Sequence, residues 1–247
     1  MTYCLAMRLD EGLVLLSDTR TNAGVDNVST YRKLFVFQPA EDRTFLIQSA
    51  GNLATTQEVL DRIQRDLDDP GATESLRTVD RLFEAALYLG RVSVGVARAH
   101  AQAVQAVGAD ATSTFLLAGQ VGDEDPDVFM VYPEGNYIRV SDERPFLQIG
   151  EAKYGKFFLE LATEAHLGLA DAAKVALSSM ISTARANLSV GPPYDLAVYR
   201  RQERALTQLR IEADSPFLAR LDEVWARHLH EALRDLPEAD QADFTAT

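Results

Sequence analysis

The sequence has little cysteine, no long apolar run and no excess of basic residues. Its single cysteine excludes an internal disulfide and a cysteine-rich zinc site, so we expect a reducing, cytoplasmic setting. A membrane-spanning helix needs about 18 or more consecutive apolar residues, and no such run occurs. Lys and Arg number 24 against 37 Asp and Glu, which gives a net charge of −13. We therefore expect no nucleic-acid or membrane partner, because both require a basic face.

Motifs for several common chemistries are also missing. None of the four histidines belongs to a His-Glu-x-x-His zinc motif. Asp123, Asp125, Asp127 and Glu134 have the spacing of a calcium loop, but Val128 stands where that loop requires glycine. No Gly-x-Ser-x-Gly, Walker or dinucleotide-binding glycine pattern occurs. We therefore expect neither a metal nor a cofactor.

The order of apolar patterns predicts strands, then helices, then strands again. Antiparallel hairpins grouped apart from paired helices indicate one α+β domain, with two sheets and helices packed outside them. We expect this domain to span residues 1–236 and an acidic tail to follow at 237–247. Turns are expected at 10–12 and 39–43, and a loop at 22–24. The predicted strands are 2–9, 13–17, 34–37, 44–49, 114–118, 128–132, 137–140, 146–149 and 195–199. The predicted helices are 53–67, 79–87 with a continuation towards 100, 154–165, 177–184, and one that opens at Ser215-Pro216.

The second residue carries the most informative chemistry. Thr2 follows Met1 directly, and a small residue there permits removal of the methionine. A threonine with a free α-amine is a nucleophile with its own base, since an amine with a pKa near 8 can accept the hydroxyl proton. Most proteins that begin Met-Thr give that threonine no role, so the surrounding residues decide.

Hairpin geometry predicts which residues surround Thr2. A turn centred on Glu11 places residue 2 opposite residue 19 or 20, so Asp18 and Arg20 should lie beside Thr2. The alternative interpretation is that Asp18 is an ordinary surface charge.

A second hairpin, turning near residue 41, pairs Lys33 with the region of Ser49 to Gly51. If the two hairpins are neighbours, Lys33 reaches Thr2 and Asp18, where its ammonium would favour the ionised hydroxyl. Gly51 stands between a strand and a helix start, and its N–H can stabilise an oxyanion. In the alternative, Lys33 is a surface charge and residues 49–51 are small only to allow close helix–sheet packing.

These residues resemble the N-terminal third of a proteasome β subunit, an N-terminal-nucleophile hydrolase. The sequence is most similar in style to the bacterial proteasome-like family called Anbu, the proposed ancestral β subunit. The resemblance spans roughly residues 2–200. It is carried by Met-Thr-Tyr-Cys at 1–4, Ser-Asp-Thr-Arg-Thr-Asn-Ala-Gly-Val-Asp at 17–26, Ser-Thr-Tyr-Arg-Lys at 29–33, Ala-Gly-Asn-Leu-Ala-Thr-Thr at 50–56, Ile-Gly-Glu-x-x-Tyr-Gly-Lys at 149–156 and Ser-Val-Gly-Pro-Pro-Tyr-Asp-Leu at 189–196.

The resemblance implies a four-layer αββα sandwich, two antiparallel sheets flanked by helices, with a set of site residues. Its catalytic residues would be Thr2 as nucleophile, Asp18 and Lys33 as supporting charges and Gly51 as oxyanion donor. Arg20, Ser49, Asn187 and Ser189 would support them. The sequence departs from proteasome β subunits in three places: no propeptide is expected before Thr2, Asn187-Leu188-Ser189 replaces an Asp and Ser pair, and Gly150-Glu151-Ala152 replaces a serine loop.

Two functions stay open. The first is a threonine-type peptidase or related amidase that cleaves peptide or amide substrates after Met1 removal. The second is a homo-oligomeric scaffold or compartment with little or no turnover. In both, the resemblance implies identical subunits in a ring or an open spiral, and we expect the apolar helices at 53–67 and 79–87 to provide contact surfaces between subunits.

Overall fold

The computed structural model describes residues 1–22, 28–163 and 167–238. The chain forms two compact units, Met1–Ile211 and Glu212–Thr247. The division of the chain into a domain at 1–236 and a tail at 237–247 stays a prediction. Among the described residues, no helix is long and apolar enough to cross a membrane.

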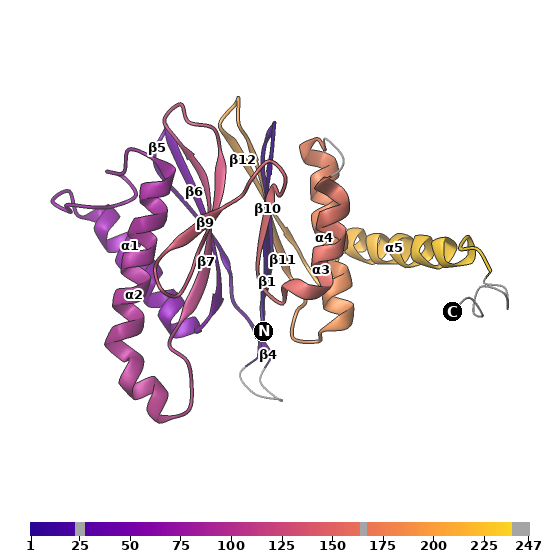
Figure 1. The fold of residues 1–247 in the computed structure, drawn as a ribbon, viewed down its shortest axis with the longest axis horizontal. Helices are drawn as coiled ribbons and strands as arrows, with labels where there is room; N and C mark the ends of the chain where they lie inside the picture. The colour runs from indigo at the N-terminus through magenta and orange to yellow at the C-terminus, as the bar shows by residue number, and fades with distance from the viewer. Residues whose placement is uncertain (23–27, 164–166, 239–247) are drawn as a thin grey trace, which may run out of the picture. The chain divides into compact units, whose positions relative to one another are not determined.

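The first sheet holds the N-terminal strand, β1, between two other strands. Its strand order is β10-β1-β2-β11-β12, and every pairing is antiparallel (Figure 1). The predicted alternation of residues 3–9 forms β1, and the tight turn before Gly12 returns the chain along it with Cys4 opposite Ser17. The final strand, β12, was not predicted. The bounds are β1 Tyr3–Leu9, β2 Gly12–Asp18, β10 Phe146–Gly150, β11 Tyr194–Arg200 and β12 Ala205–Ile211.

The second sheet has the order β5-β6-β7-β8-β9, also antiparallel. The predicted turn at 39–43 is too long, because β5 continues to Ala40 and β6 begins at Arg43; Pro39 lies within the register shift of β5 between Phe37 and Ala40. A small ribbon of β3 and β4 was missed, and Asn22 lies in it rather than in a loop; residues 23 and 24 lie outside the described part. The bounds are β3 Arg20–Asn22, β4 Val28–Thr30, β5 Leu34–Ala40, β6 Arg43–Gly51, β7 Ser113–Val121, β8 Asp127–Val131 and β9 Tyr137–Arg139.

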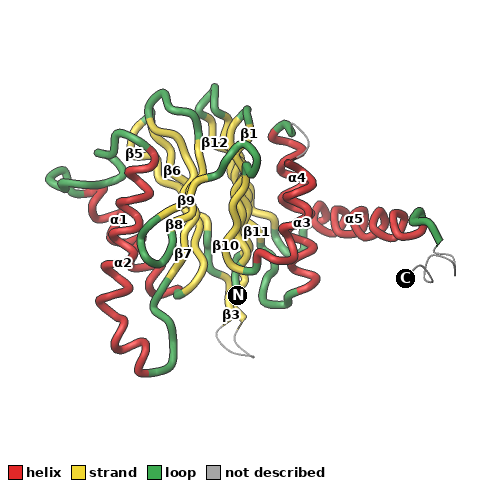
Figure 2. Tube along the Cα trace, viewed as in Figure 1, coloured by secondary structure: helices red, strands yellow, loops and turns green. Residues whose placement is uncertain are grey.

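Two helix pairs cover the outer faces of the two sheets (Figure 2). Helices α1, Leu53–Asp68, and α2, Leu82–Ala106, pack on the second sheet, while α3, Ala152–Thr163, and α4, Leu169–Ala186, pack on the first. Residues 1–211 therefore form the expected four layers, α-β-β-α. In the second unit, Ser215 precedes α5, Pro216–Arg234, as the Ser-Pro pair predicted.

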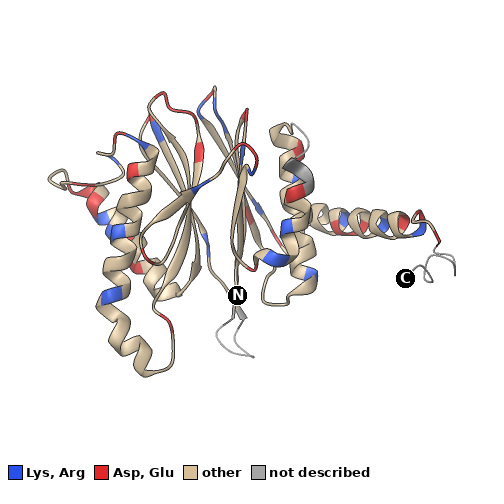
Figure 3. Cartoon of the chain, viewed as in Figure 1, with Lys and Arg blue, Asp and Glu red and all other residues tan. Residues whose placement is uncertain are grey.

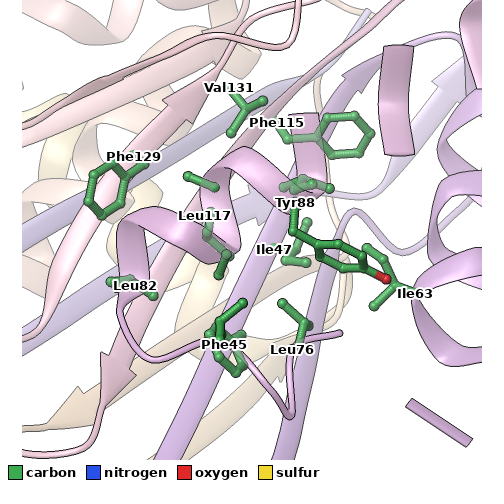
Figure 4. Close-up of a cluster of buried hydrophobic side chains, with 14 of the residues drawn as sticks. Phe45, Ile47, Ile63, Leu76, Leu82, Tyr88, Phe115, Leu117, Phe129 and Val131 are labelled. Carbon is green, nitrogen blue, oxygen red and sulfur yellow. The ribbon is translucent and has the colours of Figure 1, made fainter. Parts of the chain in front are cut away.

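The hydrophobic core has one layer between the sheets and another under α1 and α2. Alternate residues of β1 and β2, such as Cys4, Ala6 and Leu13, face the second sheet. The other layer joins the second sheet to the apolar stripes of α1 and α2 (Figure 4). Val59, Ile63 and the stripe from Leu82 are buried there within the same chain. These stripes are therefore covered by the chain's own sheet, and the expectation that α1 and α2 provide contact surfaces between subunits stays a prediction.

Two glycines in α2 give a first prediction. A Cβ on Gly90 would overlap the carbonyl oxygen of Gly135 in the turn between β8 and β9, whereas at Gly95 the nearest atom is Arg62 Nη1 at 3.7 Å. We expect Gly90→Ala to lower the free energy of unfolding by about 1–3 kcal/mol through overpacking. Gly95→Ala, the matched control, should be neutral or stabilising by up to about 1 kcal/mol. Chemical denaturation of both variants measures the difference, and equal effects would contradict the packing argument.

Candidate active site

Thr2 sits where the first strand begins, held against the loop that precedes α3. Its carbonyl oxygen accepts the N–H of Glu151 at 2.7 Å. Gly150, opposite Tyr3 across the ladder, has a φ of +81°, and a Cβ there would overlap the Thr2 carbonyl. Glycine is thus required both for the backbone conformation and for the close approach to Thr2. Thr2 itself is half-buried.

Asp18 ends β2 directly beside this position. One carboxylate oxygen accepts the N–H of Tyr3 at 3.0 Å, and the other accepts the N–H of Gly191 at 3.4 Å. The side chain is fully buried. Burial raises the pKa of the Asp18 carboxyl, while the nearby Lys33 ammonium and the two N–H groups oppose that rise.

Lys33 links the hairpin of β5 and β6 to the hairpin of β1 and β2. Its Nζ donates to Asp18 Oδ1 at 2.8 Å and to the Arg20 carbonyl at 2.7 Å, and its side chain is only 6% exposed. The Ser49 N–H donates to the Lys33 carbonyl at 3.2 Å, which confirms the predicted hairpin pairing. The alternative of ordinary surface charges is wrong for both members of this pair.

The other charged residues of Met1–Ile211 lie mainly on helices and loops (Figure 3). Within the described residues, the buried charged side chains are Asp18, Lys33 and Asp195. Asp195 lies opposite Ser17 in the sheet. Its carboxylate forms ion pairs with Arg210 at 3.3 Å and with Arg32 at 3.9 Å. The buried Lys33–Asp18 pair at the start of β1 is therefore exceptional among the residues that the structure describes, since isolated buried charges are costly.

The other predicted site residues take different positions. Gly51 ends β6 with a φ of +128°, and a Cβ would lie 2.6 Å from the Thr112 carbonyl oxygen, so close packing alone also calls for glycine. Its successor Asn52 caps α1 through the Thr55 N–H at 3.2 Å. Ser49 is buried, and its carbonyl lies 3.8 Å from the buried thiol of Cys4.

Arg20 does not point to the Lys33–Asp18 pair but to the loop after α4. Its guanidinium donates to the carbonyls of Leu188 at 2.8 Å and Val190 at 3.5 Å. A Cβ on Gly191 would overlap that guanidinium. Arg20 therefore holds the loop whose Gly191 N–H reaches Asp18.

Asn187 joins this loop to the residue opposite Thr2. Its Nδ2 donates to Glu151 Oε2 at 2.8 Å, and its Oδ1 accepts the Ser189 N–H at 2.9 Å. Glu151 was not among the predicted site residues, although its place in the Ile-Gly-Glu motif was a signal. Two of the three departures from the proteasome pattern, Asn187 and Glu151, thus contact each other.

Tyr3 anchors the strand behind Thr2 and was also missed. Its hydroxyl lies 2.7 Å from Ser179 Oγ on α4 and also accepts a hydrogen bond from Gln148. Burial raises the pKa of Tyr3 to about 12, so the hydroxyl stays neutral. Among the described residues, no cluster of three His, Cys, Asp or Glu side chains could hold a metal ion.

Two face-to-face antiparallel sheets between helix pairs, with the first strand starting beside a buried Lys–Asp pair, define a proteasome-like N-terminal-nucleophile hydrolase fold. Similarity to solved structures identifies the family of this chain. Anbu (ancestral beta-subunit) from Yersinia bercovieri is 40% identical, with a TM-score of 0.87 over 97% of this chain and 99% of that one. Anbu from Hyphomicrobium sp. strain MC1 is 41% identical, with a TM-score of 0.86 over 97% and 100%. The chain belongs to the Anbu family.

A third solved structure adds an assembly. It is the helical assembly of the Anbu complex from Pseudomonas aeruginosa. Its chain is 36% identical to this one, with a TM-score of 0.87 over 98% of this chain and 99% of that one. No family model matches the sequence, and no curated protein matches it.

Proposed function

We propose that this protein is a threonine-type amide hydrolase, a peptidase or related amidase, in which Thr2 becomes the nucleophile after removal of Met1. The observation that carries the proposal is the buried Lys33–Asp18 pair, 2.8 Å apart, with Asp18 bonded to the N–H that follows Thr2. A desolvated cation fixed beside a hydroxyl favours its ionised form.

The chemistry follows from these groups. The free α-amine takes the Thr2 hydroxyl proton as Oγ attacks the substrate carbonyl. The negative charge moves to the carbonyl oxygen, where the Gly51 N–H and the start of α1 would stabilise it. The amine returns its proton to the leaving nitrogen as the C–N bond breaks. Water then hydrolyses the resulting Thr2 ester and releases the acid product.

Labelling tests this proposal. A peptide epoxyketone should add to the chain, and intact mass should show one adduct on a protein that starts at Thr2. Fragmentation should place the adduct on residue 2. A chain that assembles but gives neither adduct nor amide hydrolysis would instead favour the scaffold or compartment, the alternative that the helical assembly of the Pseudomonas aeruginosa relative supports.

Assembly is a separate prediction. On α3, the side chains of Tyr154 and Phe157 are 38% and 62% exposed, and such apolar surface is often covered by a partner. Together with the assembled relative, this favours a homo-oligomer. Sedimentation at micromolar concentration should show a species of several chains, and Phe157→Glu should shift it to smaller species. A clean monomer would contradict the prediction and weaken the compartment alternative.

A further inference from the structure

The Glu151 side chain is a nearly buried carboxylate with weak compensation for its charge. It is only 10% exposed. Its Oε2 accepts from the neutral Asn187 amide at 2.8 Å, and its Oε1 lies 3.7 Å from Lys153 Nζ. The Lys153 side chain is 68% exposed and also lies over the ring of Tyr154, so this ion pair is a weak one. A carboxylate this far from water needs a stronger cation.

The position of Glu151 indicates which group could supply such a cation. Its N–H donates to the Thr2 carbonyl at 2.7 Å, and the pairing of Tyr3 with Gly150 puts Thr2 and Glu151 opposite one another. Removal of Met1 would create an α-ammonium on Thr2, next to this carboxylate. In the chain as it stands, that nitrogen is a neutral amide.

The other charged groups around this position have their own partners. Asp18, from β2, is bonded to Lys33 and to two backbone N–H groups. Lys33, which precedes β5, is bonded to Asp18 and to the Arg20 carbonyl. The Arg20 guanidinium is bonded to the loop after α4. Of the charged groups that the structure describes around this position, Glu151 and its exposed neighbour Lys153 are left to interact with the amine.

We propose that the Glu151 carboxylate, positioned by Asn187, is the counter-ion of the Thr2 α-ammonium. This inference rests on the proposed function in its first step, the removal of Met1. The carboxylate stabilises the protonated amine, so the amine gives up its proton at a higher pH. Lys33 acts in the opposite direction. The balance of the two charges then sets the pH at which Thr2 has a free base.

The titration of the amine tests the proposal without needing hydrolysis. Brief pulses of acetic anhydride across a pH series acetylate only the unprotonated amine, and the mass of the N-terminal peptide gives the midpoint. Glu151→Gln should lower this midpoint by about one pH unit, because an adjacent opposite charge is lost. Gln keeps the size of the side chain and can still accept the Asn187 N–H, so the packing is retained.

Two further variants separate charge from structure. Asn187→Ala should lower the midpoint less than Glu151→Gln, since the carboxylate stays but is no longer held. Asp171→Asn on α4 removes an equal charge from a 61% exposed side chain paired with Lys174, and should leave the midpoint unchanged. If Glu151→Gln lowers only the melting temperature and not the midpoint, Glu151 is merely structural and the proposal fails.

The outcomes also distinguish this inference from the proposed function. A shifted midpoint in a protein that gives no epoxyketone adduct and no hydrolysis supports the counter-ion and rejects the hydrolase. An unshifted midpoint in a protein that labels and hydrolyses rejects the counter-ion alone. A chain that retains Met1 overturns both, because no ammonium then forms at Thr2.

Discussion

Thr2→Ala is expected to abolish the epoxyketone adduct and to reduce any amide hydrolysis by on the order of 10⁶-fold, the usual loss when a nucleophile is removed. Alanine is small enough to permit Met1 removal, so residue 2 still gains a free α-amine and only the hydroxyl is lost. The carbonyl of residue 2 can still accept the Glu151 N–H, which is a backbone contact. Circular dichroism and sedimentation should therefore match the wild type.

Thr2→Ser is the matched control for this change. It keeps a hydroxyl beside the amine and should retain part of the labelling and hydrolysis. Intact mass and a fluorogenic peptide assay on all three proteins give the comparison. Undiminished hydrolysis by Thr2→Ala would show that the activity belongs to another group and end the proposal.

The sequence was sufficient for contacts that hairpins set over short distances. The turn at Glu11 predicted Thr2 near Asp18, and the turn near 41 predicted Lys33 beside Ser49. In a hairpin, turn position fixes the register, and a slip of one residue would move the apolar side chains to the wrong face. Both pairings could thus be predicted before any long-range packing was known.

Contacts between distant segments had no such signal. Tyr3 and Ser179 are 176 residues apart, and only the packing of α4 on the first sheet brings them together. The Glu151–Asn187 contact joins two loops in the same way. The sequence also could not show that the apolar stripes of α1 and α2 are covered by the chain's own sheet, because such a stripe has the same pattern whether it covers its own sheet or a partner.

The missed strands have a different physical cause. Strand β12 is largely exposed along Ala205–Ile211 and lies at the edge of its sheet, so it lacks the apolar alternation that identifies a half-buried strand. The two strands of the small ribbon are three residues each, which is too short for periodicity to show.

Lys33→Ala is expected to slow labelling by roughly 10²–10³-fold, the loss typical for a group that stabilises developing charge. It should also destabilise the fold by roughly 3–5 kcal/mol, because Asp18 would stay buried without its cation. Asp18→Ala should have a comparable effect, since Lys33 would keep only the Arg20 carbonyl as partner. Labelling rates and melting temperatures measure both losses.

The double variant decides whether Lys33 and Asp18 act as one unit. Their side chains are 6% and 0% exposed and 2.8 Å apart, so removing the second after the first should cost little more. Lys174 and Asp171 on α4, a similar 2.7 Å apart but 73% and 61% exposed, provide the control pair. Lys174→Ala should cost less than about 1 kcal/mol and leave labelling unchanged, because water already screens that pair. If the fold-losses in labelling rate from Lys33→Ala and Asp18→Ala instead multiply in the double variant, the two charges act independently. Thr2 is then not activated by a coupled Lys33–Asp18 pair.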